Sequence, residues 1–212
     1  MKHRLRVSRL FGQRQTACGS EQFFIASFAF RHHSQNLRES SQDMQNLPIY
    51  RIGEGHDIHR TTQGRPLILG GVTVEAPFGL DGHSDADVLT HAVIDALLGA
   101  TGHGDIGEWF ANTDKRWKGA DSATMLRHVL DSVITGEWQI QNLDCTISAE
   151  QPTLSAWKAV IRQRLAVLLD VSESVLNVKA KSGEQVGPIG CGDAIAADVV
   201  VLICRESPMK SQ

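Results

Sequence analysis

Three side chains of metal-binding types are candidates for a common site, namely Asp57, His59 and His91. Asp57 and His59 are two residues apart in a segment that reads as a β-strand, where alternate side chains project from the same face. His91 falls within a helical pattern and could be an ordinary hydrogen-bonded core histidine. Because two imidazoles and a carboxylate are a common ligand set for zinc, the three residues together predict a zinc site.

Two carboxylates share the helical stripe of His91. Asp87 and Asp95 each stand four residues from His91, a spacing that places all three side chains on one side of a helix. Either carboxylate could orient the histidine by accepting a hydrogen bond from its second ring nitrogen. Each could equally be an exposed helix charge, and the sequence leaves both interpretations open.

A second polar cluster, residues 82–87 (GHSDAD), precedes that helix. A helix N-terminus presents free N–H groups and favours anions, so His83 and Ser84 are candidate phosphate contacts. Ser84 is also predicted to be the N-cap of the helix, with Asp87 three residues later completing a capping box. The cluster therefore predicts anion binding beside the zinc site.

Further candidate ligand contacts lie in three other segments. Residues 105–107 (DIG) and 112–114 (NTD) read as loops that bind a polar ligand, although Asp, Asn and Gly also serve ordinary turns. Residues 181–184 (KSGE) combine a carboxylate with hydroxyl and backbone donors, which can hold Mg²⁺ and phosphate oxygens together. A turn at the end of a strand explains this last segment as well.

The elements that must position these groups follow from the hydrophobic pattern. Strands are predicted at residues 50–58, 66–74, 138–149, 176–182 and 194–204, and the last is apolar enough to be central. Helices are predicted at residues 84–100, from 121 or 122 to about 134, and at 155–169. This order favours an α+β fold with one mixed β-sheet covered by helices on one face.

Length and composition limit the classes of protein to consider. The 212 residues suit one ordinary domain, and a formal net charge of −3 lacks the basic excess typical of nucleic-acid binding. No apolar run is long enough to predict a membrane-spanning helix. The four cysteines form no CxxC pair, which favours a reducing compartment. We therefore expect neither nucleic acid nor membrane as a partner.

The composition changes near residue 48. Residues 1–20 contain basic residues but no acidic ones, and residues 31–47 are rich in Ser, Gln and Asn. We predict that 1–47 is a poorly ordered extension and that 48–212 is the folded domain. The extension could be a targeting peptide or the product of a wrongly assigned start. The expected location is cytoplasmic, or a plastid or other organelle if 1–47 is a transit peptide.

Several segments resemble, in the same order, the motifs of the 2-C-methyl-D-erythritol 2,4-cyclodiphosphate synthase family. They are residues 51–60, 82–91, 95–100, 104–107, 113–114, 118–122, 142–144 and 178–180. The resemblance covers about residues 51–204 and makes 48–212 a cyclodiphosphate synthase domain. It implies a homotrimeric phosphorus-oxygen lyase of the non-mevalonate (methylerythritol phosphate) route to isoprenoid precursors, with sites between subunits. Such a lyase converts 4-diphosphocytidyl-2-C-methyl-D-erythritol 2-phosphate to the cyclic diphosphate and CMP.

The resemblance also assigns roles to individual residues. It implies zinc on Asp57, His59 and His91, and Mg²⁺ or Mn²⁺ at Glu184 with the substrate diphosphate. His83 and Ser182 are the expected catalytic residues, through stabilisation of the transition state. The expected substrate contacts are Asp57, His59, His83, Ser84, Asp105, Ile106, Gly107, Asp114, Ala149, Pro152, Lys181, Ser182, Gly183 and Glu184.

Some positions depart from the family pattern. Thr153 stands where a lysine is common, which would weaken a phosphate contact. Pro188 and Cys191 replace an aromatic residue and an arginine that line a central isoprenoid diphosphate cavity in some members, so we do not expect that regulatory site here. Two alternatives remain at this point: a zinc-dependent phosphohydrolase, and a non-catalytic metal-binding trimer of the same fold.

Overall fold

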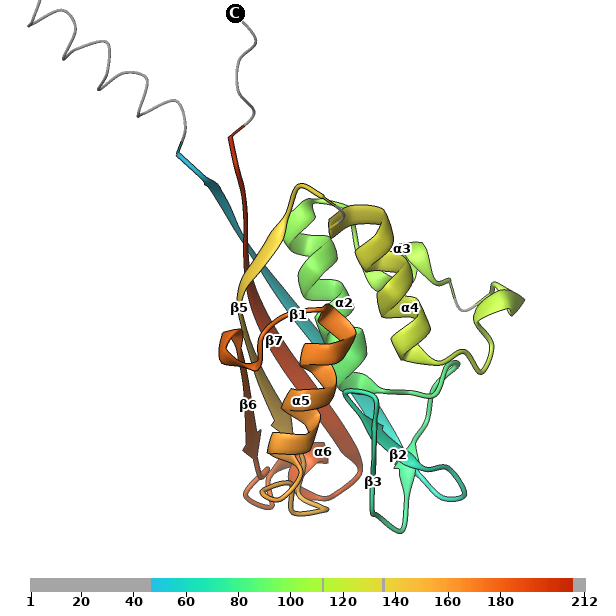
Figure 1. Ribbon diagram of the computed structural model, residues 1–212. Coiled ribbons are helices and arrows are strands. Elements are labelled where there is room, and N and C mark those ends of the chain that lie inside the picture. The colour runs from blue at the N-terminus through green and yellow to red at the C-terminus, as the bar shows by residue number, and fades with distance from the viewer. Residues whose placement is uncertain (1–46, 112, 135, 208–212) are drawn as a thin grey trace, which may run out of the picture. The chain divides into compact units, whose positions relative to one another are not determined.

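The computed structural model describes residues 47–111, 113–134 and 136–207 (Figure 1). The described residues from Pro48 onward belong to a single unit. The predicted extension lies outside the described residues except at its last position, so its role stays a prediction. In the described ranges, no helix combines the length and apolar character needed to cross a membrane, and Cys145, Cys191 and Cys204 are free thiols.

Within the described residues, five strands form the main sheet in the order β4-β1-β7-β5-β6. Their bounds are Ile49–Thr62 (β1), Gly79–Leu80 (β4), Gln139–Ser148 (β5), Leu176–Lys181 (β6) and Ala194–Arg205 (β7). β5 and β6 pair in parallel, whereas the other pairs are antiparallel. The sheet is therefore mixed, and the apolar strand near the C-terminus is central, as predicted.

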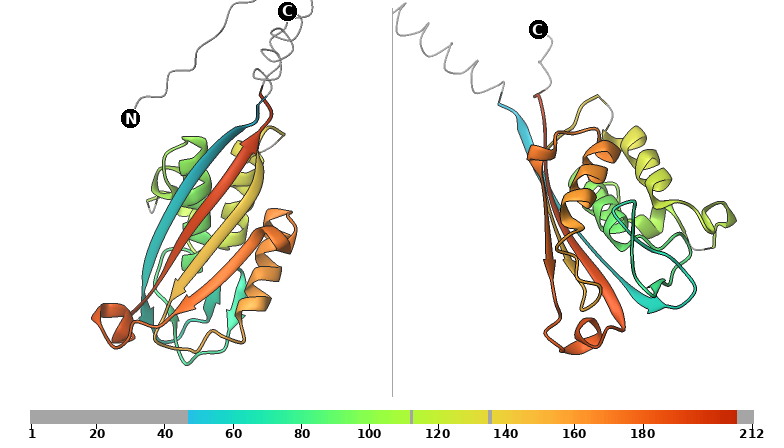
Figure 2. Two further views of the ribbon diagram at one scale, coloured as in Figure 1. Left: turned by 90° about the vertical axis from the view of Figure 1, so that its left-hand side faces the viewer. Right: turned by 60° about the horizontal axis from the view of Figure 1, so that its bottom comes forward.

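The main helices cover one face of this sheet and leave the other face open (Figure 2). The helical segments are Val88–Thr101 (α2), Ile106–Trp109 (α3), Lys115–Trp117 (η2), Ser122–Val129 (α4), Leu130–Ile134 (η3, a π-helical turn), Lys158–Leu169 (α5), Glu173–Val175 (η4) and Gly187–Gly190 (α6). Burial alternates along β7. Ala197 and Val199 face the helices and are fully buried, whereas Asp198 and Val200 face the other side and are exposed. The predicted α+β arrangement with helices on one face is confirmed.

Residues 66–74 were predicted as one strand, and this was wrong. They form a hairpin of β2 (Leu67–Leu69) and β3 (Val72–Val74). The turn is Gly70-Gly71, whose φ values are 61° and 71°. A tight hairpin turn requires such positive φ values, which residues with side chains adopt less readily than glycine. The helix start was also misplaced, because the N-cap of α2 is Asp87 rather than Ser84.

Helix α2 lies unusually close to β1. A β-carbon on Gly53 would stand 1.9 Å from the carbonyl oxygen of Ala96, and one on Gly55 would stand 2.0 Å from that of Ala92. Only glycine permits such contact between the two backbones. Since strand side chains alternate, the face that carries these glycines continues into Asp57 and His59. The close packing therefore brings the metal-binding end of the strand against the helix that carries His91.

Candidate metal centre

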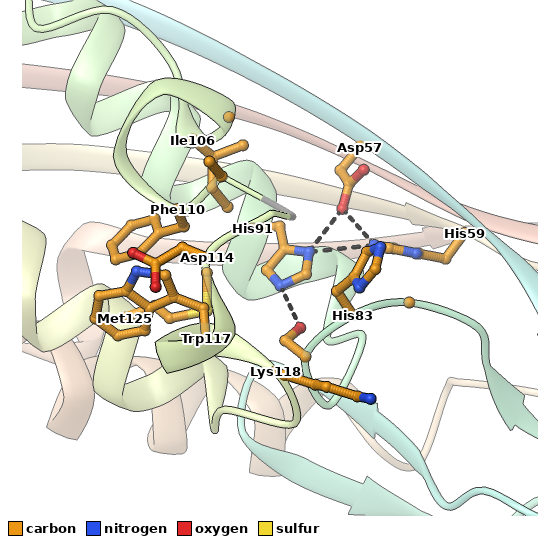
Figure 3. A pocket seen from close by; sticks show the side chains of 14 residues that line it. Asp57, His59, His83, His91, Ile106, Phe110, Asp114, Trp117, Lys118 and Met125 are labelled. Atoms are coloured by element: carbon orange, nitrogen blue, oxygen red, sulfur yellow. Dashed lines mark hydrogen bonds and ion pairs between the residues drawn. The ribbon is translucent and has the colours of Figure 1, made fainter.

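Asp57, His59 and His91 converge at the point where β1 meets α2 (Figure 3). Asp57 Oδ2 lies 2.9 Å from His59 Nε2 and 3.0 Å from His91 Nδ1. The two ring nitrogens are 3.2 Å apart. Each residue offers one ligand atom, and the three atoms lie within 4.8 Å of one another. The predicted trio is thus brought together.

The donor set fits a zinc ion. Two imidazole nitrogens and a carboxylate oxygen are typical zinc ligands, and three protein ligands leave a coordination position for substrate. His91 is buried, whereas Asp57 and His59 keep 25% and 18% of their side-chain surface exposed. The exposed sides line a cavity, so a bound ion would be within reach of a ligand there.

Electrostatics within the trio favour an anionic Asp57 beside a protonated His59 in the absence of metal. Burial alone would raise the pKa of Asp57, but hydrogen bonds from His59 and His91 outweigh it and lower that pKa. Burial would lower the pKa of His59, and its hydrogen bond to Asp57 outweighs that effect and raises the pKa. A metal-binding imidazole nitrogen must be unprotonated, so the raised pKa of His59 opposes metal binding at low pH.

The far nitrogen of each histidine ring is also engaged. His59 Nδ1 lies 2.6 Å from the backbone oxygen of Asp81 and donates to it, which turns Nε2 towards the trio. His91 Nε2 lies 2.9 Å from Ser122 Oγ and 3.1 Å from Ser84 Oγ. Partners of this kind orient metal-binding imidazoles.

Of the two interpretations left open for the helix carboxylates, the structure excludes the one in which they orient His91. Asp87 accepts hydrogen bonds from the Thr90 side chain and from the backbone N–H groups of Gly70, Gly71 and Thr90. It is buried because it joins the start of α2 to the β2–β3 turn. Asp95 accepts a bond of 2.7 Å from the Ile106 backbone N–H and anchors the next loop instead.

A cavity of about 310 Å³ opens beside the trio. Five further residues predicted to contact substrate line it: His83, Ser84, Ile106, Gly107 and Asp114. The side chain of Asp105 is directed elsewhere, since its Oδ1 caps α3 by accepting from Glu108 N at 3.0 Å. Asp114 forms an ion pair of 2.6 Å with the exposed Arg116. Their roles in substrate binding stay predictions.

Sequence reasoning gave no individual contact role to several other residues that line the cavity, among them Phe110, Trp117, Lys118 and Met125. Phe110, Trp117 and Met125 form an apolar side that faces the trio across the cavity (Figure 3). The rings of Phe110 and Trp117 meet edge to face at 4.7 Å between centroids. Lys118 adds a positive charge suited to a phosphate ligand. Phe110 and Trp117 stand beside the segments predicted to be ligand-binding loops, and this position could have identified them. Lys118 falls within a motif of the recognised family, residues 118–122.

The remaining predicted contacts gather in a second place, where two loops are joined. Ala149 N donates to the Lys181 backbone oxygen at 2.9 Å, and Gly183 N donates to the Glu150 carboxylate at 3.0 Å. Ser182 Oγ donates to Glu184 Oε1 at 2.6 Å. These loops, residues 149–155 and 181–187, contribute no residue to the lining of the metal cavity.

The two places lie at the same end of the sheet but on different strands. Ser148 on β5 pairs with Lys181 on β6 and with Ala196 on β7, which in turn pairs with Ile58 on β1. β7 and β5 stand between β1 and β6, so about 14 Å separates the two outer strands at a normal strand spacing. A single copy of the chain holds two separate groups of predicted contacts.

An α+β domain that carries a carboxylate–bis-histidine cluster at the edge of a polar cavity belongs to the class of single-domain metal-binding enzymes. Comparison with known proteins identifies the family. The model described as the YgbB family matches residues 50–204, and the chain belongs to that family.

Named relatives agree with the resemblance found in the sequence. The 2-C-methyl-D-erythritol 2,4-cyclodiphosphate synthase of Synechococcus elongatus is 50% identical over 157 residues, which cover 74% of this chain and 98% of the relative. The synthase of the same name from Synechocystis is 49% identical over 160 residues, or 76% and 99% of the two chains. A solved 2C-methyl-D-erythritol-2,4-cyclodiphosphate synthase in a CDP-bound form matches with a TM-score of 0.67 and 33% identity, covering 72% and 99%.

Proposed function

We propose that this protein converts 4-diphosphocytidyl-2-C-methyl-D-erythritol 2-phosphate to 2-C-methyl-D-erythritol 2,4-cyclodiphosphate and CMP. An oxygen of the 2-phosphate forms a bond to the β-phosphorus of the diphosphate. The bond from that phosphorus to the bridging oxygen breaks, and CMP leaves with the electron pair, so no water is consumed. The observation that carries the proposal is the convergence of Asp57, His59 and His91 beside a polar cavity, in a chain half identical to named synthases.

The residue types suit phosphoryl transfer, which depends on positioning and charge neutralisation more than on covalent help from the protein. Asp57, His59 and His91 would hold zinc, and Glu184 would hold Mg²⁺ or Mn²⁺ together with the diphosphate, since a single exposed carboxylate suits that shared coordination. When bound, such cations neutralise phosphate charge and polarise the phosphorus–oxygen bonds.

The other residues act directly on the substrate in this proposal. His83 and Ser182 donate hydrogen bonds to the phosphoryl oxygens as charge develops on them. Ser84, Ile106, Gly107, Asp105 and Asp114 hold the phosphate and erythritol parts. The cytidine and diphosphate are held by residues of the second group, namely Ala149, Pro152, Lys181, Ser182, Gly183 and Glu184.

A complete site requires the two groups to come together, and we propose that a homotrimer does this. In a cyclic oligomer, the part of β1 that β4 leaves unpaired in one subunit can face the β6 edge of the next subunit, because a rotation repeats the same contact around the ring. The open face of the sheet supports self-association, since Ile52, Ile58 and Val200 are exposed there at 71%, 47% and 47%.

The direct test incubates the purified protein with the cytidyl substrate, Zn²⁺ and Mg²⁺, and measures CMP and the cyclic product. Release of inorganic phosphate instead would indicate a phosphohydrolase, and release of nothing at high enzyme concentration would overturn the proposed activity. Full-length protein and a variant lacking 1–47 are compared, which also tests whether residues 48–212 suffice.

The proposed shared site has its own test. His91→Ala and Ser182→Ala subunits are each expected to have strongly reduced activity as pure oligomers. When the two are mixed, unfolded and refolded together, about a quarter of the contacts in a random ring pair an intact metal group with an intact Ser182 group. Restored CMP release of that order supports sites between subunits. Activity no greater than the sum of the two pure variants would argue that each chain carries its whole site.

A further inference from the structure

Two buried hydroxyls and a carboxylate form a chain of hydrogen bonds behind His91, on the side opposite the metal-binding nitrogen. His91 Nδ1 faces Asp57 and His59. Its Nε2 contacts the hydroxyls of Ser122 at 2.9 Å and Ser84 at 3.1 Å, and both serines are buried. When Nδ1 binds a metal it carries no proton, so a neutral His91 ring must carry its proton on Nε2 and donate it to these hydroxyls.

A hydroxyl that accepts from His91 must direct its own proton elsewhere. Ser122 has such an acceptor, because its Oγ donates to Asp85 Oδ1 in a very short hydrogen bond. The other oxygen of Asp85 accepts from the Ser122 backbone N–H at 3.1 Å. Asp85 is itself fixed, since its backbone N–H donates to the Ala120 oxygen at 3.0 Å. The chain of donors therefore runs in one direction, from His91 through Ser122 to a carboxylate.

Helix capping does not account for this arrangement. Ser122 is the first residue of α4, but the N-cap is Asp121, whose carboxylate accepts from Ala123 N at 2.9 Å. Asp85 lies in the loop before α2, whose N-cap is Asp87. The Asp85 carboxylate also accepts from the backbone N–H groups of Asp87 at 3.3 Å and Ser122 at 3.1 Å, which holds it between the two helix starts. Neither contact requires the Ser122 hydroxyl, so helix capping leaves its bond to Asp85 and its approach to His91 unexplained.

We infer that Ser122 and Asp85 are positioning residues for the metal centre, acting in series through His91 Nε2. The inference rests on the proposed function for the metal-binding role of His91. A carboxylate that accepts, directly or through a hydroxyl, from the outer nitrogen of a metal-binding imidazole fixes the ring and its tautomer and increases the basicity of the inner nitrogen. Loss of such a partner typically weakens metal binding about 10- to 100-fold.

The test measures zinc affinity by competition with a chromogenic chelator, without substrate. Ser122→Ala and Asp85→Asn are each expected to weaken zinc binding about 10- to 100-fold. Because the groups act in series, the zinc affinity of the double variant should equal that of the single variant with the lower affinity. Ser172→Ala is the matched control, since it removes an exposed hydroxyl that accepts from Ser174 N at the start of η4; it should leave the affinity unchanged.

A spectroscopic readout separates positioning from a general loss of stability. In zinc-loaded protein with ¹⁵N-labelled histidine, the Nε2–H proton of His91 should give a slowly exchanging signal. That signal should weaken or vanish in Ser122→Ala while the melting temperature stays near that of the wild type. Asp85→Asn keeps the buried Ser122 in place and so remains informative if Ser122→Ala fails to fold.

The inference is overturned if folded Ser122→Ala and Asp85→Asn bind zinc as tightly as the wild type, or if their effects add. Failure of the proposed function would look different, because wild-type protein would then release no CMP while the zinc affinities still separated the variants. A wild-type protein that binds no zinc would remove the basis of the inference itself.

Discussion

The two groups of predicted contacts differ in how firmly a single chain holds them. Around Asp57, His59 and His91, each side chain is tied by at least two hydrogen bonds or ion pairs, and His91 is buried. In the other group Ser182 and Glu184 are exposed, and their side chains bond mainly to each other. The metal group is preorganised by one chain, whereas the side chains of the second group are exposed and have few partners within that chain.

Backbone geometry follows the same division. The metal group stands on a long strand and a long helix that touch through Gly53 and Gly55. The second group follows β6 in a loop where Glu184 and Gln185 have positive φ values of 50° and 60°. Sites on regular elements are held more precisely than sites on loops. We therefore expect changes in the first group to lower zinc binding and activity together, and changes in the second to lower activity without lowering zinc binding.

The largest effect is expected for His91→Ala. Removing one of three ligands should abolish stoichiometric zinc binding and lower CMP release by on the order of 10³-fold. Metal content after dialysis and CMP release under substrate saturation measure the two effects. His103→Ala is the control, because it removes an exposed imidazole that does not line the cavity. A His91→Ala protein with full zinc and full rate would overturn the assignment of the metal site.

Ser182→Ala tests the other side of the comparison. We expect CMP release to fall by roughly 10²-fold, the usual cost of losing one donor to a developing phosphoryl charge. Zinc affinity should not change, because the Ser182 hydroxyl contacts Glu184 and not the metal group. Parallel chelator competition and CMP assays check this separation. A loss of zinc together with activity would contradict this separation and show that the two groups are coupled.

Gly55→Ala tests whether close backbone packing organises the metal group. The new methyl group would stand 2.0 Å from the Ala92 oxygen, so β1 and α2 must move apart. We expect destabilisation of about 1–3 kcal/mol or more, seen in chemical denaturation, with weaker zinc binding. Gly99→Ala is the matched control in α2, since its nearest neighbour would be the Glu54 oxygen at 3.8 Å. That change should be neutral or stabilising, because alanine favours helices.

The metal group could be predicted because residue spacing along the chain shows which ligands share a face of a strand or a helix. Two ligands alternate on one strand, the third lies in a clear helical pattern, and the recognised motifs include all three. Sequence reasoning failed for the partners of His91, since Ser122 is 31 residues away and only the packing of α4 reveals the contact. The Gly70-Gly71 hairpin was missed because β2 and β3 are only three residues each, so their apolar run reads as one strand.

The smallest expected effect concerns Asp95, which joins helix α2 to the loop that contains Ile106. It lies on α2 one turn after His91, and its carboxylate accepts from the Ile106 N–H. Burial, followed by repulsion from Asp105 and Asp57, raises the pKa of Asp95 above the ordinary value of an aspartate, against the lowering effect of its bond from Ile106. A carboxyl with a raised folded-state pKa costs stability when it is charged, so the cost is present at neutral pH and disappears below the unfolded-state pKa.

Asp95→Asn should therefore stabilise the chelator-treated protein slightly at pH 7, because the amide oxygen can still accept from Ile106 while the buried charge is gone. The advantage should shrink between pH 7 and acidic pH, as wild-type Asp95 takes up its proton. Asp95→Ala lacks the acceptor and should be less stable than Asp95→Asn throughout this range. Melting temperatures of the three proteins across this range decide the point. If Asp95→Asn is the less stable protein at pH 7, the charge itself holds the Ile106 loop, and the metal group extends one helical turn further than the trio.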